Sequence, residues 1–245
     1  MTDTRAVPAS YEIAGFFWAT LAAAVVLALL ILILPGAIFL KISNYLQILT
    51  ALAGAFALLF LWHKSRKKEF LLWAGAGLGL WGIANIGWYV TILMGQRDMV
   101  FPGIIDAGII ASILILGFAF RKGFARKPTS PCISPYISLC ILAVSLLIPV
   151  AVIAIVGLSP ATLVTLIYFV ACGTLLVTGL NHAPEESPMV LSGVAIFALT
   201  FMIYPLRELL LITNPVLPVI GTFVVMGFSL LVLGLLPISG PERTA

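Results

Sequence analysis

The sequence predicts an all-α fold, a polytopic helical membrane protein with about eight transmembrane helices. Hydrophobic residues make up 62% of the 245-residue chain and charged residues only 9%, whereas about a quarter of an ordinary soluble domain is charged. The apolar residues also lie in runs of roughly 20, the length that one helix needs to cross a bilayer. A soluble protein of this composition could not cover its surface with polar groups, while a membrane protein exposes apolar surface to lipid.

Eight candidate spans follow one another, and turn-forming or charged residues separate them. The first apolar run is longer than the core of a signal peptide and lacks a clear cleavage motif, so we expect it to be retained as a span. The fifth and sixth runs are separated only by Gly157-Leu158-Ser159-Pro160, which favours a tight helical hairpin. We therefore expect residues 1–245 to form a single integral membrane domain. Its spans are residues 11–34, 43–62, 70–94, 102–120, 134–156, 160–180, 189–212 and 216–237.

A weak similarity within the sequence suggests a repeat of four spans, residues 1–128 and 129–245. The segment "FPGIIDAGIIASILILGFAF" (101–120) resembles "LPVIGTFVVMGFSLLVLGLL" (217–236), because both begin with an apolar residue and proline and end in an apolar run around a glycine. Asp106 and Thr222 each stand four residues after that proline. Two such sets of four spans would be parallel repeats. The shared composition of transmembrane helices is the alternative explanation of this likeness.

Basic residues predict the orientation of the chain. With eight spans both termini lie on one side, and that side receives most of the lysines and arginines, which favours the cytoplasm. We therefore expect a multi-pass protein of the cell membrane with both termini cytoplasmic. Its basic loops would contact anionic lipid head groups, and the net charge of +4 then gives no reason to expect nucleic-acid binding. The cytoplasmic set is Arg5, Lys64, Arg66, Lys67, Lys68, Arg121, Lys122, Arg126, Lys127 and Arg243, against Lys41, Arg97 and Arg207.

Four polar residues inside the spans are the candidate site: Asn85, Asp106, Arg207 and Glu208. A charged residue at a helix centre costs roughly 2.5–3.5 kcal/mol on insertion scales, so such positions suggest function. At 1.5 Å per residue, Asp106 lies about 6 Å, Arg207 about 7 Å and Asn85 about 13 Å below the outer ends of their spans. We expect Asp106 and Arg207 to pair in an outward-facing pocket with Asn85 at its floor.

Two alternatives give these residues a structural role. An ion pair and an amide hydrogen bond can simply hold helices together, at about 0.6–2 kcal/mol for each interhelical bond. Arg207 and Glu208 can also reach outward from a seventh span that ends early. The sequence leaves the ligand-binding and structural interpretations open.

The sequence lacks the residues that most forms of intramembrane catalysis require. The two histidines, His63 and His182, stand in predicted loops, so no pair is available for haem, and no zinc motif is present. The last lysine is Lys127, which leaves the second half without a retinal-binding lysine. Asp106 is the only clear intramembrane aspartate, so an aspartic-protease pair cannot form. We expect no enzyme activity, no cofactor and no metal.

Residues 72–118 resemble the multi-span sensor regions at the N-termini of some bacterial and archaeal histidine kinases and diguanylate cyclases. The resemblance rests on a tryptophan-rich span with an amide, a short outer loop with proline, and an apolar helix with an early aspartate. In this sequence those residues are Trp81, Asn85, Trp88, Pro102 and Asp106. The resemblance implies a sensory membrane scaffold. Kinase, cyclase and PAS output domains are absent from the 245 residues, so it also implies a partner membrane or signalling protein.

The leading functional hypothesis is therefore a non-enzymatic sensor-like or accessory membrane module. A small transporter or permease is the second hypothesis, and it requires a polar path to the cytoplasmic side. Pro149 and Pro205 could break helices as transporters require, or simply bend them. An intramembrane enzyme is the third and has no supporting constellation of residues.

Overall fold

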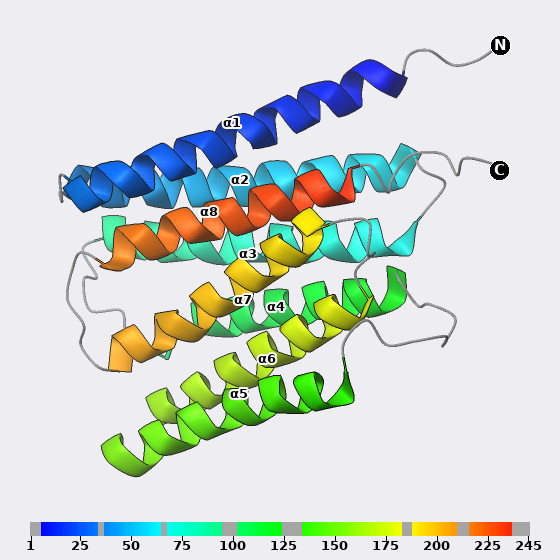
Figure 1. Ribbon diagram of the computed structural model, residues 1–245. Helices are drawn as coiled ribbons and strands as arrows, with labels where there is room; N and C mark the ends of the chain where they lie inside the picture. Colours follow the sequence, from blue (N-terminus) through cyan, green and yellow to red (C-terminus); the bar gives the residue numbers. More distant parts are fainter. Residues whose placement is uncertain are drawn as a thin grey trace.

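The computed structural model describes residues 6–33, 37–64, 68–94, 102–123, 134–182, 188–209 and 216–236. Within these residues the chain forms eight α-helices (Figure 1). Seven of them contain stretches long and apolar enough to cross a membrane, and the last contains the shorter apolar segment Val219–Leu235. The predicted fold class is thus confirmed, and the chain is a multi-pass helical membrane protein. The helices are α1 (Ala6–Ile33), α2 (Ala37–Lys64), α3 (Glu69–Leu93), α4 (Ile104–Gly123), α5 (Pro135–Val156), α6 (Pro160–His182), α7 (Pro188–Leu209) and α8 (Val216–Leu235).

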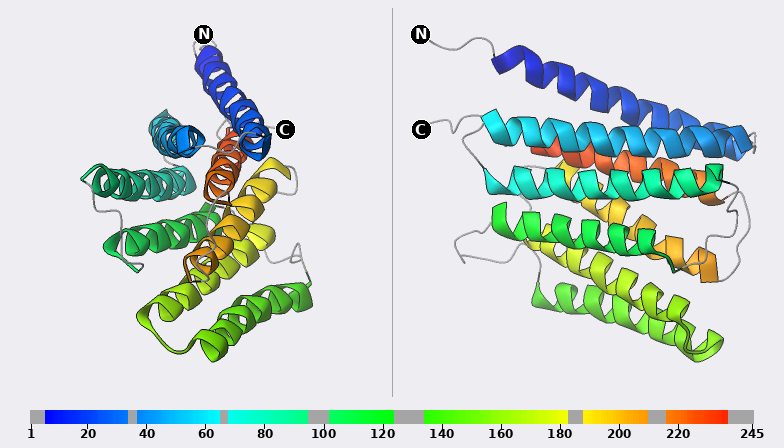
Figure 2. Two further views of the ribbon diagram at one scale, coloured as in Figure 1. Left: turned by 90° about the vertical axis from the view of Figure 1, so that its left-hand side faces the viewer. Right: turned by 180° about the vertical axis from the view of Figure 1, so that it is seen from behind.

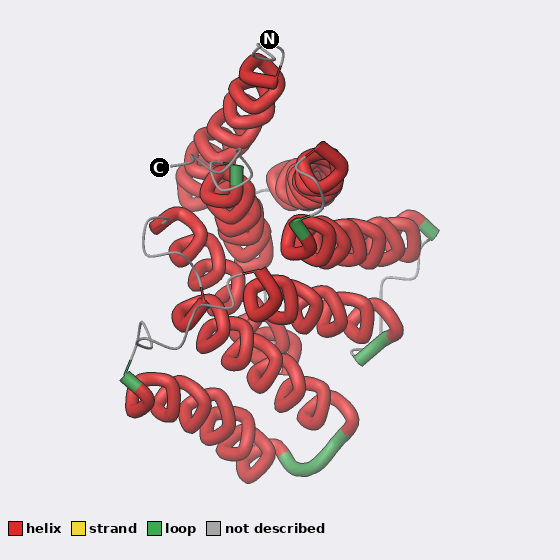
Figure 3. The backbone as a smooth tube through the Cα atoms, turned by 90° about the vertical axis from the view of Figure 1, so that its right-hand side faces the viewer, coloured by secondary structure: helices red, strands yellow, loops and turns green. Residues whose placement is uncertain are grey.

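Six of the helices form two layers of three. Helices α2, α3 and α4 make one layer and α8, α7 and α6 the other, as the end-on views show (Figures 2 and 3). Contacts between α2 and α8 and between α4 and α6 join the layers at both edges and close the bundle into a ring. Helix α1 packs outside this ring on α8 and α2, and α5 packs outside it on α6.

The hairpin between α5 and α6 has the tight connection that its sequence predicts. Gly157 adopts a positive φ of 96°, a backbone conformation that glycine tolerates without strain, and its N–H donates to the Ile153 carbonyl over 2.8 Å. Ser159 then caps α6: the Thr162 N–H donates to its hydroxyl over 3.2 Å, and the Ser159 N–H donates to the Thr162 hydroxyl over 2.9 Å. These two caps end one helix and begin the next within three residues.

Small residues allow close approach where helices cross. A Cβ atom on Gly193 of α7 would lie 2.7 Å from the backbone nitrogen of Leu231 and 2.8 Å from the carbonyl oxygen of Gly227, both on α8. The backbones of α7 and α8 therefore touch at this crossing. Helices α3 and α4 are joined by the Ser112 hydroxyl, which donates to the Gly77 carbonyl over 2.8 Å. Such close seams are a common means of packing helices in lipid.

The two ends of the bundle differ in character. We call the end at which α1 begins and α8 ends the basic end, because it carries Lys64, Lys68, Arg121 and Lys122. The ammonium groups of Lys64 and Lys122 lie over the rings of Phe60 and Phe118. The interior between the middle of the bundle and the basic end is packed with buried apolar side chains, among them Leu58, Leu71, Leu116, Leu175, Phe228 and Val232.

Candidate functional site

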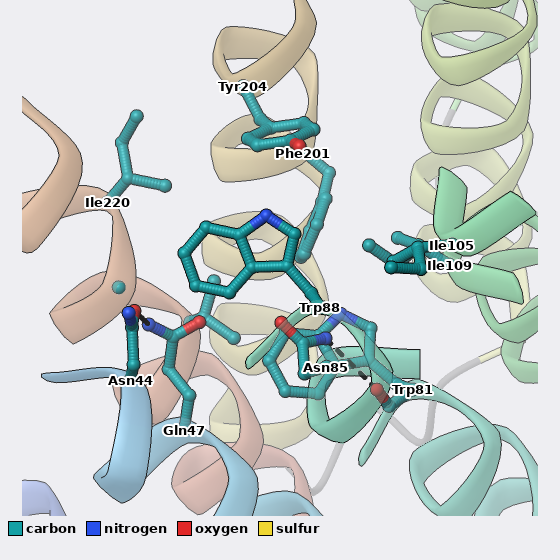
Figure 4. Close-up of a pocket in the computed structure, with 12 residues that line it drawn as sticks. Asn44, Gln47, Trp81, Asn85, Trp88, Ile105, Ile109, Phe201, Tyr204 and Ile220 are labelled. Carbon is teal, nitrogen blue, oxygen red and sulfur yellow. Dashed lines mark hydrogen bonds between the residues drawn. The ribbon is translucent and has the colours of Figure 1, made fainter. Parts of the chain in front are cut away.

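A cavity of about 60 Å³ lies between the two layers, in the half of the bundle away from the basic end. Helices α2, α3 and α4 line it from one layer, and α7 and α8 from the other (Figure 4). This volume holds several water molecules or a small organic group. The lining residues are Asn44, Gln47, Trp81, Asn85, Trp88, Ile105, Ile109, Phe201, Tyr204, Ile220, Gly221 and Val224.

Helix α2 contributes two neighbouring amides to the cavity. The side-chain nitrogen of Gln47 donates to the side-chain amide oxygen (Oδ1) of Asn44 over 3.4 Å and to the Ser43 hydroxyl over 3.4 Å. Gln47 is only 9% exposed, although its side chain ends in a polar amide. A Cβ atom on Gly221 would collide with the side chains of Ser43 and Gln47, so this glycine makes the room in which α2 presents its amides beside α8. Asn44 and Gln47 stand in the first turns of the predicted span 43–62 and were not among the predicted site residues.

Asn85 reaches the cavity from α3. Its side-chain nitrogen donates to the Trp81 carbonyl one turn earlier in the same helix, over 3.0 Å. The oxygen of the Asn85 side-chain amide points away from this hydrogen bond, toward the cavity (Figure 4). The amide group is thus fixed by its own helix. The described contacts give it no hydrogen bond to another helix, so its oxygen is available at the cavity wall.

Aromatic side chains form much of the remaining wall. Trp81 is only 1% exposed and meets Phe228 and Phe201 edge to face, with ring centroids 4.8 Å and 6.1 Å away. The indole of Trp88 lies in the centre of the group, and Tyr204 borders it from α7 (Figure 4). Among the described residues, the Trp81 indole nitrogen has no hydrogen-bond partner. A buried donor left in this state costs about 1–3 kcal/mol.

Asp106 lies beside the cavity without lining it. Its two carboxylate oxygens accept hydrogen bonds from the Gly103 N–H over 2.7 Å and from the Tyr168 hydroxyl over 2.9 Å. The first bond caps the N-terminal turn of α4, where the helix dipole also favours a negative charge. The second bond joins α4 to α6, and both Asp106 and Tyr168 are buried. The predicted site residue Asp106 therefore links α4 to α6 through a hydrogen bond behind the cavity wall.

Arg207 and Glu208 belong to α7, but their side chains lie outside the part of the chain that the structure describes. The predicted pairing of Arg207 with Asp106 consequently stays a prediction. Two residues earlier in α7, Pro205 follows the cavity residue Tyr204. A proline has no N–H, so the Phe201 carbonyl one turn before it receives no helical hydrogen bond from that position.

The described side chains contain no group of three or more histidines, cysteines, aspartates or glutamates placed to hold a metal ion. The site is therefore characterised by amide and aromatic groups. No protein-family model matches the sequence, and comparison with curated proteins and with solved structures found no significant match.

Proposed function

We propose that this protein is a non-enzymatic, sensor-like or accessory membrane module that binds a small molecule in the cavity between its layers. The buried Trp81 N–H, which lacks a partner among the described residues, is the main observation in favour. Three amide side chains converge on the same space from α2 and α3. Cavities with apolar walls and a few converging polar groups are typical small-molecule sites.

The lining favours binding over transport. A transporter needs a polar path from the cavity to the other side of the membrane. Between Trp81 and the basic end, the described interior residues are mostly apolar and closely packed, for example Leu71, Leu116 and Phe228. Pro149, the other proline considered for a broken helix, lies in the peripheral helix α5, away from the cavity.

The proposed orientation places the cavity in the outer half of the membrane and the basic end at the cytoplasm. Lys64, Lys68, Arg121 and Lys122 would then meet anionic lipid head groups. The resemblance of residues 72–118 to sensor regions of prokaryotic kinases and cyclases supports a signalling context. We accordingly propose that a partner membrane or signalling protein carries the output.

Ligand binding in the cavity can be tested with a fragment panel of neutral, cationic and anionic compounds. Binding to the protein in detergent micelles would be measured by ligand-observed saturation-transfer NMR. We expect some fragments to bind the wild type and to lose at least about tenfold in affinity, about 1.4 kcal/mol, when Ile105→Trp fills the cavity.

The matched control is Leu114→Trp on the same helix, where the side chain is exposed at the surface of the bundle. This variant adds the same indole without entering the cavity, so fragment binding should be unchanged. Size-exclusion chromatography would first check that both variants elute as the wild type does. If they do, and if Ile105→Trp does not abolish the binding of any fragment, the proposal is wrong.

A further inference from the structure

We infer that the cavity selects an uncharged small molecule bearing both a hydrogen-bond acceptor and a donor, with a primary carboxamide as the simplest such ligand. This inference rests on the proposed function, because it specifies the chemistry of the ligand that the cavity binds. It follows from the charge, the hydrogen-bonding capacity and the apolar surface of the lining.

The described side chains of the lining offer no charge to pair with an ionic ligand. The lining contains no lysine, arginine, histidine, aspartate or glutamate among the side chains that the structure describes. The nearest described carboxylate, Asp106, is already bonded to Gly103 and Tyr168. Moving an ion from water into such a space without a counter-charge is strongly unfavourable, whereas a neutral polar group needs only hydrogen bonds.

The lining contains both hydrogen-bond donors and hydrogen-bond acceptors. The Trp81 indole is a pure donor, and it is buried without a partner among the described residues. The Asn85 side chain uses its nitrogen on the Trp81 carbonyl, so its oxygen is an acceptor. A primary carboxamide complements this pair, since its oxygen accepts from the indole and its NH₂ donates to the Asn85 oxygen.

The other side of the cavity suits a short hydrocarbon group. Ile105 and Ile109 line it from α4, and Ile220 and Val224 line it from α8. Burial of apolar surface there contributes to binding while the amide group fixes the orientation. A volume of about 60 Å³ suits a ligand of a few heavy atoms.

Three compounds of nearly the same shape test the charge preference: propionamide, propionate and propylammonium. Their affinities for the full-length protein in micelles would be measured by saturation-transfer NMR at constant ionic strength. We expect propionamide to bind at least about tenfold more tightly than either ion. Both ions should also fail to displace propionamide at equal concentration.

The hydrogen bonds are tested by Asn85→Leu, which keeps the size of the side chain, and by Trp81→Phe, which removes the indole N–H. We expect each variant to weaken propionamide binding by about tenfold. Trp73→Phe is the matched control, because Trp73 is partly exposed and packs against Phe118 near the basic end. In ¹⁵N-tryptophan-labelled protein, the Trp81 indole proton should move downfield when propionamide is added.

The outcomes separate the inference from the proposed function. If propionate or propylammonium binds more tightly than propionamide and Ile105→Trp abolishes that binding, the cavity is a ligand site and only the inference is wrong. The inference would also be wrong if the resonance of the Trp81 indole proton lay upfield and did not shift when propionamide was added. That result would mean that the N–H points at the Phe201 ring. If Ile105→Trp affects the binding of none of the three compounds, the inference is wrong, and the proposed function fails as well only if no compound of the fragment panel loses binding in that variant.

Discussion

At the scale of single residues, Asp106 illustrates how a carboxylate is accommodated in a membrane-spanning helix. Both of its oxygens accept hydrogen bonds, and it stands in the first turn of α4, where the free N–H groups and the helix dipole stabilise a negative charge. The buried Tyr168 hydroxyl on α6 also gains a hydrogen-bond partner through this contact, because it donates to the Asp106 carboxylate. These contacts give Asp106 a structural role in joining α4 to α6.

Asp106→Asn should therefore lower stability without changing ligand binding. The amide has a single acceptor oxygen for the two donors, so we expect the free energy of unfolding to fall by about 1–3 kcal/mol. Denaturant unfolding in micelles measures this change. Because the two residues share one bond, the loss in the double variant Asp106→Asn with Tyr168→Phe should be smaller than the sum of the two single losses. A variant of normal stability that no longer binds propionamide would instead make Asp106 a ligand-binding residue.

At the scale of helices, the crossing of α7 and α8 is the closest approach of two backbones that the described glycines reveal. The atoms that a Cβ on Gly193 would meet belong to the backbone of α8, which cannot move aside as a flexible side chain can. Gly79 on α3 is different, because a Cβ there would meet only the Cβ of Ala55 at 3.5 Å, an ordinary van der Waals contact. The two glycines therefore differ in what they contribute to packing, although both stand in apolar helices.

Gly193→Ala should destabilise the protein and Gly79→Ala should not. In the first variant α7 and α8 must separate, and overpacking of this kind costs about 1–3 kcal/mol. The second variant adds a methyl group in permitted space and serves as the matched control. Thermal unfolding in micelles, followed by circular dichroism, measures both. Equal unfolding temperatures for the two variants would contradict the close backbone contact.

At the scale of the whole molecule, the order of helices around the ring supports the predicted repeat of four helices. Exchanging α2 with α6, α3 with α7 and α4 with α8 leaves the neighbour relations of the six-helix ring unchanged. Outside the ring, α5 packs on α6 and α1 packs on α2, but α1 packs mainly on α8, and the corresponding contact of α5 with α4 is not of comparable extent among the described residues. We propose that residues 1–128 and 129–245 are related by a twofold axis parallel to the helices.

The proposed orientation predicts which ends of the bundle a membrane-impermeant reagent can reach. In a variant without the native cysteines, Leu158→Cys in the exposed α5–α6 hairpin should react with an impermeant maleimide on intact cells. Lys64→Cys at the basic end should react only after the membrane is permeabilised. The reverse pattern would mean that the cavity opens toward the cytoplasm.

The helices could be predicted from the sequence because each apolar run is bounded by turn residues or charges. The hairpin at Gly157 followed from the same reasoning. The cavity could be predicted only in part: Asn85 lines it, the predicted pocket residue Asp106 lies beside it, and Asn44, Gln47 and the N–H of Trp81, which has no partner among the described residues, were not foreseen. A membrane span is apolar on every face, so its periodicity does not reveal which side meets another helix.

The same limit explains why Tyr168 was overlooked. It stands in the apolar run of α6, far from Asp106 in sequence, and nothing in its neighbours indicates that the two side chains meet. The pairing depends on which helices become neighbours, and that is decided by tertiary packing.

The backbone contact at Gly193 has a mechanical consequence for the cavity. Two helices whose main chains touch resist sliding past each other, so we expect α7 and α8 to move together on the side of the cavity that faces the basic end. Helix α8 lines the cavity at Gly221 and Ile220, and α7 lines it at Phe201 and Tyr204. We therefore expect a displacement of either helix at the cavity to be transmitted toward the basic end by both helices.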